Sequence, residues 1–359
     1  MINTSTHFNE MLLLNFETIS KWIRTKIIGV VDLNNEQFLE AFQQNYNRVF
    51  NYMGGGDLKL LISLACKYTL AEKQFSGVQL QKVCEKLEDA GKGTFSIPKY
   101  STVNYRIASH LIVEGNMEKT ISDIIINDQF LKEAKFKKSP FRGIGALFLQ
   151  EDKQQQHAER ARKMYVEMNR NQRILTTNGD IPYIVFLTSN NENDPLTQAQ
   201  TIYKYYQALR KQKFVMGNQL QALAQIMTIY SSVYNEILLQ YVLQLKKELE
   251  KRGIKVKKMH YPFIGVLAMA ATNASKIDEV IQLHNQLLEL KVFKTAKYYA
   301  LIVAIQKIIR DTIEIQEIID LAPITNLPQL VELLDIAEML VEIGRILPGG
   351  ISEVADFFN

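Results

Sequence analysis

The sequence predicts an all-α protein, and within that class a right-handed helical-repeat solenoid of about six to seven helix pairs with a period of ~40 residues. The first observation is a large apolar residue that follows a basic helix end at nearly constant spacing. These anchors are Phe95, Phe136, Leu175, Phe214, Ile254 and Phe293, separated by 41, 39, 39, 40 and 39 residues. The second observation is that strand-like alternation of period two is absent over any useful length.

Each anchor is followed by a small-and-aliphatic segment and then by a longer amphipathic helix that ends in Lys or Arg. Gly145 and Gly265 lie in two of the aliphatic segments, where small residues allow helix axes to approach closely. Since one helix pair cannot bury its own apolar face, successive pairs are expected to stack into one continuous body. An irregular helical bundle with coincidental spacing is the competing interpretation.

The clearest unit runs from Leu175 to Phe214. Its first helix is expected from about Ile181 to Ser189, after a turn at residues 178–180, and Asp194 is expected to cap the second helix. The second helix should bury one face, formed by Ala199, Ile202, Tyr203, Tyr206 and Leu209.

Charge divides the chain into unequal parts. Residues 311–359 carry ten acidic residues and one basic residue, a net of −9, whereas residues 1–310 carry 41 basic and 28 acidic residues, a net of +13. We expect N-terminal capping helices over 1–56, a repeat body over 57–311 and acidic C-terminal capping helices over 312–359. The amphipathic segment from Leu330 to Ile346 is interpreted as a cap with a solvated acidic face. Alternatively, it folds over a basic groove and competes with an anionic ligand.

Several protein classes find no support. No basic and apolar leader opens the chain, and the longest strongly apolar run, from Phe263 to Ala271, is shorter than a membrane span. Cys66 and Cys84 lack the spacing of a metal knuckle or a redox pair, so both are predicted to be buried thiols. We therefore expect a cytoplasmic protein without a membrane partner.

Catalytic patterns are equally scarce. The five histidines are scattered, HExxH and GxSxG do not occur, and His157 with Glu159 lacks the PCxxC that would complete a zinc deaminase set. Gly54 to Gly56 precede a helix but no Gly-Lys-Ser/Thr follows. No catalytic residue, metal ligand or cofactor is predicted, and the protein is expected not to be an enzyme. An enzyme with a composite pocket assembled from distant residues remains an alternative.

Nucleic-acid binding is a second alternative, based on two basic clusters that contain aromatic residues. Basic side chains neutralise phosphates and aromatic rings stack on bases. Cations are also favoured at helix C-termini, so a solvated face explains the same pattern. The first cluster is Lys132, Lys135, Lys137, Lys138 and Arg142 around Phe136 and Phe141; the second is Lys246, Lys247, Lys251, Arg252, Lys255, Lys257 and Lys258 before His260 and Tyr261.

The leading hypothesis is a non-enzymatic repeat protein that binds a protein or peptide on its concave face. Polar residues in the inter-helix turns would line up along one rim of a solenoid and grip such a ligand. The competing interpretation is that they cap helices and bridge neighbouring units. The candidate partner-binding residues are Asn178, Asp180, Tyr183, Asn218, Gln221, His260 and Tyr261.

The segments LTTNGDIPYIVFL, GNQLQALAQIM, HYPFIGVLAMA and FSIPKY resemble the recurring landmarks of a bacterial family, seen in Gram-positive bacteria and known only as a domain of unknown function. The resemblance covers the chain from about Leu58 to Arg310. This copy departs from the pattern at Ala224, where a hydroxyl residue is expected. The resemblance implies an intracellular location and a helical body, and it supplies no catalytic residue to carry over.

Overall fold

The computed structural model describes residues 35–91, 101–115, 117–150, 152–171, 175–190, 192–270 and 274–319, together with Leu330, Val331, Leu333 and Leu334. Over these ranges the chain is helical and contains no strand, which confirms the all-α prediction. The first 34 residues, which are part of the N-terminal capping region expected over 1–56, and the anchor Phe95 lie outside the described residues.

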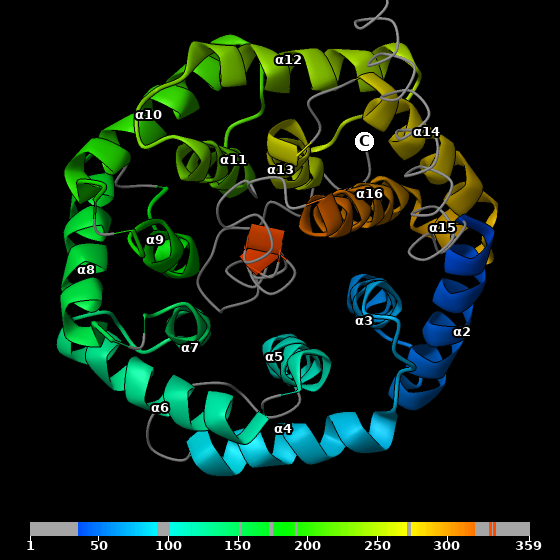
Figure 1. Ribbon diagram of the computed structural model, residues 1–359, viewed down its shortest axis with the longest axis horizontal. Helices are drawn as coiled ribbons and strands as arrows, with labels where there is room; N and C mark the ends of the chain where they lie inside the picture. Colours follow the sequence, from blue (N-terminus) through cyan, green and yellow to red (C-terminus); the bar gives the residue numbers. More distant parts are fainter. Residues whose placement is uncertain are drawn as a thin grey trace, which may run out of the picture.

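The helices alternate between two concentric layers that form a ring (Figure 1). The outer layer consists of α2 (Asn35–Met53), α4 (Gly77–Gly91), α6 (Met117–Glu133), α8 (Gln154–Asn171), α10 (Pro195–Lys211), α12 (Glu236–Lys251) and α14 (Ala274–Glu289). The inner layer consists of α3 (Leu58–Leu70), α5 (Thr102–Glu114), α7 (Pro140–Leu147), α9 (Ile181–Leu187), α11 (Asn218–Tyr230), α13 (Tyr261–Ala270) and α16 (Lys297–Ile319). Short helical turns η1 (Asn178–Asp180) and η2 (Lys258–His260) precede α9 and α13, and α15 (Lys291–Thr295) precedes α16.

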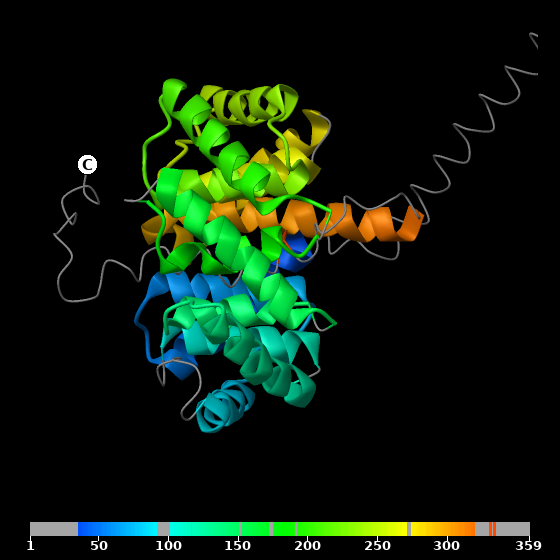
Figure 2. The same ribbon diagram turned by 90° about the vertical axis from the view of Figure 1, so that its left-hand side faces the viewer.

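The ring closes where α2 and α3 meet α15 and α16. The rings of Phe42 in α2 and Phe293 in α15 stack with centroids 5.5 Å apart. Inside them, α16 packs against α3, where Gln306 Oε1 lies 3.5 Å from Cys66 Sγ. Figure 2 shows that α16 runs past the other helices on one side of the ring. Closure covers apolar faces that would otherwise need separate caps.

Sequence pattern decides which layer a helix occupies. The outer helix α2 buries Phe38, Phe42, Asn45 and Val49, one stripe at helical spacing. In contrast, every residue of α9 and of α13 is buried. A helix that is apolar on all sides needs neighbours on all sides, and the inner layer provides them.

Glycine sets the spacing between inner helices, as the small residues predicted. A Cβ at Gly265 of α13 would lie 2.7 Å from Leu223 Cδ1 and 3.1 Å from Ile226 Cγ2 of α11. A Cβ at Gly145 of α7 would lie 3.0 Å from Ile181 Cγ2 of α9. Only a residue without a side chain allows these approaches without displacement of the neighbour.

The anchor residues have a defined structural role. Phe136, Phe214 and Ile254 each donate their backbone N–H to the carbonyl oxygen five residues earlier, at 3.0, 3.2 and 3.0 Å. The residue before each anchor, Lys135, Lys213 or Gly253, has a positive φ. This is the Schellman motif, in which the residue after the left-handed one packs back on the helix. The three anchors are buried.

Local expectations for the unit from Leu175 to Phe214 are largely confirmed. Asp194 caps α10 by accepting a hydrogen bond from the Thr197 N–H at 2.9 Å. The expected burial of Tyr203 is wrong, because its side chain is 39% exposed. The buried face is rotated toward Thr201 and Tyr205, which leaves Tyr203 on its edge.

Both cysteines are free and buried, as predicted. Burial raises the pKa of the Cys84 thiol to about 12. The right-handed solenoid with ~40-residue helix pairs and the division into caps and body stay predictions.

Candidate protein-binding site in the ring lumen

The inner helices present their innermost faces to the lumen of the ring. Outer helices and neighbouring inner helices cover the other sides of α9, α11 and α13. Nevertheless α9 and α13 are buried throughout, and so is α11 from Gln219 to Thr228. Burial of the lumen-facing side means that the lumen itself is occupied.

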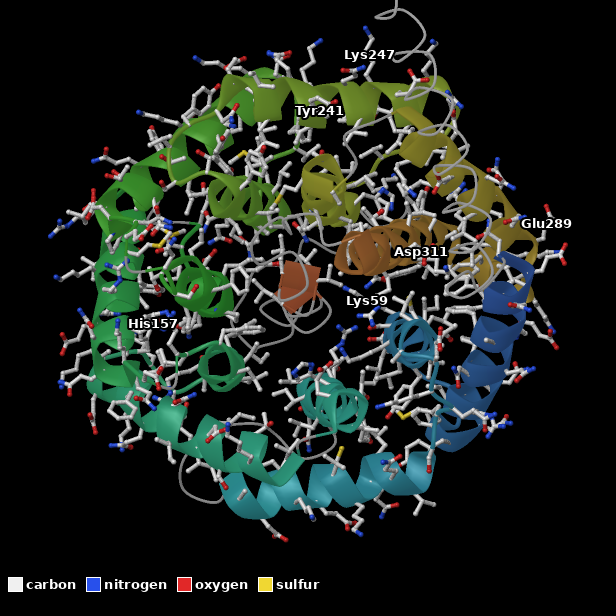
Figure 3. All side chains as sticks on the ribbon, viewed as in Figure 1. Lys59, His157, Tyr241, Lys247, Glu289 and Asp311 are labelled. Carbon is white, nitrogen blue, oxygen red and sulfur yellow. The ribbon has the colours of Figure 1, made fainter. Side chains whose placement is uncertain are left out.

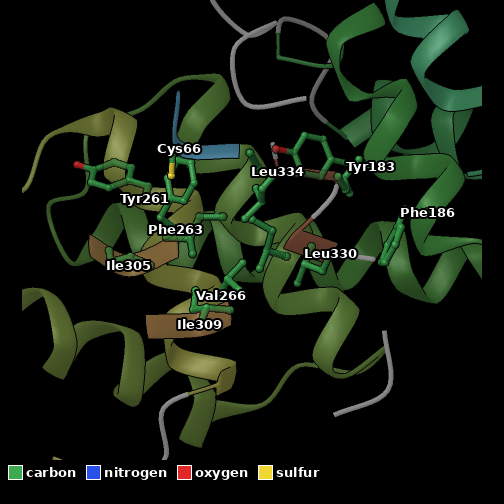
Figure 4. Close-up of a cluster of buried hydrophobic side chains, with 14 of the residues drawn as sticks. Cys66, Tyr183, Phe186, Tyr261, Phe263, Val266, Ile305, Ile309, Leu330 and Leu334 are labelled. Atoms are coloured by element: carbon green, nitrogen blue, oxygen red, sulfur yellow. The ribbon is translucent and has the colours of Figure 1, made fainter. Parts of the chain in front are cut away.

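The described residues of the C-terminal segment lie at the centre of the ring (Figure 1). Leu330 and Leu333 are 0% exposed and Leu334 is 2% exposed, so the leucines belong to the hydrophobic core. Figure 4 shows Leu330 and Leu334 in one cluster with residues of three inner helices, namely Tyr183 and Phe186 of α9, Phe263 and Val266 of α13, and Ile305 and Ile309 of α16.

The described leucines of the amphipathic segment are buried. Its role as a terminal cap with a solvated acidic face stays a prediction. The sequence signal that could have located it is the leucine spacing of i, i+3 and i+4 together with inner helices that are apolar on all sides. The competition with an anionic ligand stays a prediction.

The lumen wall is basic along α3. Lys59, Ser63 and Lys67 are half-buried and follow one another at intervals of four residues, so they form one stripe. Figure 3 shows Lys59 on the lumen side of α3. Nearby on α5, burial and, to a smaller extent, the charge of Lys67 lower the pKa of His110 to about 3. The wall therefore combines an apolar sector with a basic one.

Two of the predicted partner-binding residues meet directly. Asp180, the last residue of η1, accepts a hydrogen bond at 2.6 Å from Gln221 Nε2 of α11 through its Oδ1. The same oxygen accepts from Gln225 Nε2 at 2.9 Å, and Oδ2 accepts from the Thr177 N–H at 2.8 Å. Gln225, one helical turn beyond Gln221, was missed because its amide looks like an ordinary helix residue in the sequence.

Asp180 is buried beside neutral partners. Burial raises its pKa to about 6, and the hydrogen bonds from Thr177, Gln221 and Gln225 offset part of that rise. The carboxylate connects the start of α9 to the next inner helix, and the geometry is that of a bridge between neighbouring units. Asn178 and Asn218, at the starts of η1 and α11, are half-buried.

His260 and Tyr261 also bond to the chain itself. His260 Nδ1 accepts from the Lys257 N–H at 3.0 Å, so Nε2 carries the proton and donates to the Tyr298 carbonyl oxygen at 2.9 Å. The Tyr261 hydroxyl accepts from the Val215 N–H at 3.2 Å, and its ring packs 4.8 Å from that of Phe214. The remaining candidate, Tyr183, is buried and belongs to the lumen cluster. The role of all seven residues in partner binding stays a prediction.

The basic clusters are partly occupied by internal partners. Arg142 is buried and makes two 2.8 Å hydrogen bonds to the carboxylate of Asp128. Lys246 pairs with Glu250 at 2.7 Å. The rings of Phe136 and Tyr261 are buried and thus unable to stack on bases. These contacts support the solvated-face interpretation, and nucleic-acid binding stays an alternative.

A cavity of 190 Å³ lies beside His260 and His284. It is smaller than the few hundred Å³ of most small-molecule sites. Burial lowers the pKa of His284 and lowers that of His260 to about 4, so both imidazoles are neutral near pH 7. Within the described parts of the chain, no group of three or more His, Cys, Asp or Glu side chains is arranged to hold a metal ion.

Among the described helices, none is both long and apolar enough to cross a membrane. No curated protein and no solved structure matches the chain. The bacterial origin expected from the resemblance stays a prediction. A family model does match, over residues 34–333. This span includes the ring and most of the described residues of the C-terminal segment. The chain therefore belongs to the family described as "Protein of unknown function (DUF4003)".

Proposed function

We propose that this protein is a non-enzymatic helical-repeat protein, closed into a ring, that binds a protein or peptide partner in the lumen. The lumen wall is the concave face of the helix array, where repeat proteins present their binding surface. The observation that carries the proposal is the burial of three leucines, two of which, Leu330 and Leu334, cluster with side chains of α9, α13 and α16. A site that accommodates an apolar helical segment of its own chain has the shape and polarity to accommodate one from a partner.

The occupant expected is an amphipathic helix rather than an extended strand. The described helices leave no sheet edge for strand addition, whereas helical grooves accept side chains at i, i+3 and i+4. Tyr183 and Phe186 supply aromatic surface at the apolar side of the lumen. Large apolar and aromatic side chains of this type carry most of the binding energy in protein interfaces.

Site-specific photo-cross-linking tests the proposal. A benzophenone amino acid replaces Phe186 in the lumen wall of the full chain, and a matched protein carries it at Tyr241 of the outer-layer helix α12 (Figure 3), which is 37% exposed. Both proteins are irradiated in a cytoplasmic extract with and without nuclease. We expect an intermolecular polypeptide cross-link from position 186 that nuclease does not affect.

Two outcomes would contradict the proposal. Cross-links that form only at position 241 would place the partner on the outside of the ring. Cross-links that disappear on nuclease treatment would favour the nucleic-acid alternative, because the partner would then depend on an intact polynucleotide.

A further inference from the structure

The lumen segment has the spacing of a helical ligand. Leu330, Leu333 and Leu334 stand at i, i+3 and i+4, which places them on one face of a helix. All three are buried, whereas Val331, on another face, is half-buried. Burial therefore follows the helical face, as it does for a helix docked in a groove.

The contacts of the segment come from helices far away in the sequence. Figure 4 places Leu330 and Leu334 with side chains of α9, α13 and α16, not with a helix pair of their own. The leucines are thus held by the same wall that the proposed function assigns to a partner. A segment attached through the chain has a high effective concentration at that wall, so it competes strongly with a separate ligand.

Charge favours the same arrangement. The leucines stand within residues 311–359, whose net charge is −9, and the lumen carries the basic stripe of Lys59 and Lys67 on α3. Opposite charges in a partly enclosed space attract more strongly than on an open surface. A ligand that combines acidic residues with apolar anchors would therefore complement both sectors of the wall.

We propose that the segment containing Leu330, Leu333 and Leu334 is an intramolecular ligand, which occupies the lumen until a partner displaces it. This inference rests on the proposed function and names the partner's chemistry. The partner segment is an acidic amphipathic helix with the pattern Leu-x-x-Leu-Leu. A permanent structural plug is the alternative that the experiment must separate from it.

A synthetic peptide of residues 325–345, labelled with fluorescein, serves as the probe. Its binding is measured by fluorescence anisotropy to the full chain in three forms: wild type, the release variant Leu330→Ser/Leu333→Ser, and the matched control Val331→Ser. The double substitution removes two buried anchors, while the control changes a half-buried position of the same segment. We expect the release variant to bind the probe at least about tenfold more tightly than the other two.

Hydrogen exchange of the backbone amides at positions 330, 331, 333 and 334 separates the outcomes. In the release variant these amides should exchange faster than in the wild type. Unchanged protection would show that the leucines do not hold the segment, which would overturn the inference. Equal probe affinity for wild type and release variant would overturn competition and leave the proposed function intact.

The remaining outcomes are also decisive. Fast exchange without probe binding to any form would overturn the proposed function together with the inference. A release variant that loses its helical circular dichroism would identify the segment as a permanent part of the core and overturn displacement. Leu334→Ala removes fewer contacts, and we expect it to retain the fold and bind the probe with intermediate affinity.

Discussion

Asp180 and His260 occupy the same place in two units of the ring, 80 residues apart in the sequence. Each is the last residue of a short turn before an inner helix, and each accepts a hydrogen bond from the backbone N–H three residues earlier. Each also reaches the next inner helix in the ring, Asp180 through the amides of α11 and His260 through the carbonyl of Tyr298. One is an acid and the other a base.

Burial acts in the same sense on both groups. It raises the pKa of Asp180 to about 6 and lowers that of His260 to about 4, and both shifts are toward the neutral form. Asp128, in contrast, is buried against an opposite charge, that of Arg142. The junctions at Asp180 and His260 instead rely on dipoles from amides and backbone groups.

The largest effect is expected at His260. The substitution His260→Ala removes two hydrogen bonds, leaves the Lys257 N–H and the Tyr298 carbonyl without that partner, and opens a void in a buried site. These losses should lower the free energy of unfolding by roughly 3 kcal/mol. Urea denaturation followed by circular dichroism measures the change.

His284→Ala is the matched control. This histidine also lines the cavity beside His260, but it forms a hydrogen bond with the adjacent Asn285, which bridges no helices. We expect about 1 kcal/mol or less. Equal effects of the two substitutions would show that the bridge from His260 to α16 adds nothing, which would break the comparison.

The next largest effect is the pH dependence of stability, which should differ between Asp180 and His260. Asp180 has a raised pKa in the folded state, so between about pH 4 and pH 6 the folded protein binds the proton more tightly than the unfolded chain. Stability from this group therefore falls as pH rises through that window, by up to roughly 3 kcal/mol for a shift of about two pH units. Asp180→Asn should remove this slope, measured as the midpoint of urea denaturation at several pH values.

His260 should give a pH dependence of stability with the opposite sign. Its pKa is lowered in the folded state, so between about pH 4 and pH 6.5 the unfolded chain binds the proton more tightly. Stability from this group is lost as pH falls through the window. The pH dependence of stability that remains in Asp180→Asn comes from His260. The variant His260→Gln should therefore flatten that slope. Slopes of the same sign in the two variants would contradict the opposite directions of the two pKa shifts.

The sequence was sufficient to predict the helices and the place of the anchors, because both follow from local chemistry. Periodic apolar residues determine the buried faces, and the basic helix end followed by an apolar residue marks the Schellman motif at Phe214 and Ile254. The small residues predicted close packing, which Gly265 shows. Asp180 and Gln221 were singled out as candidate partner-binding residues; the structure bonds them to each other, and a role in partner binding stays a prediction.

Closure of the ring and the lumen segment could not be predicted in the same way. Both depend on contacts between residues far apart in the sequence, such as Phe42 with Phe293, which no local pattern encodes. Whether Asp180 contacts a partner or the next unit also depends on the distance to α11. That distance is set by packing, and the sequence alone does not give it.

A smaller effect on stability is expected in α9 and α13, the inner helices that follow Asp180 and His260. Five residues after Asp180 stands Val185, and five residues after His260 stands Gly265, against which α11 packs closely. Gly265→Ala should destabilise the protein by about 1–2 kcal/mol, since displacement of Leu223 outweighs the higher helix propensity of alanine. The midpoint of thermal unfolding measures this change.

Gly115→Ala and Gly145→Ala make the comparison more specific. Gly115 has a positive φ and no atom within 4 Å of the added Cβ, so its substitution reports backbone strain alone. Gly145 has a looser contact than Gly265, at 3.0 Å from Ile181 Cγ2. If Gly145→Ala destabilised the protein as much as Gly265→Ala, the close contact with Leu223 would not be the cause of the destabilisation in Gly265→Ala.

The smallest effect is expected where the outer helices end. The helix that leads into His260 ends with Gly253 at a φ of 85°, whereas the helix of the preceding unit ends with Lys213 at a φ of 63°. Side chains pay roughly 1 kcal/mol in this left-handed region, and glycine loses more entropy on folding. Lys213→Gly should therefore stabilise the protein by about 0.5 kcal/mol, while Gly253→Ala should destabilise it by about 1 kcal/mol.

Lys211→Gly, inside α10, is the control and should destabilise the protein, because there glycine only lowers helix propensity. Opposite signs for Lys211→Gly and Lys213→Gly, two residues apart in one helix end, would show that the turn conformation governs the effect and that loss of a lysine charge does not.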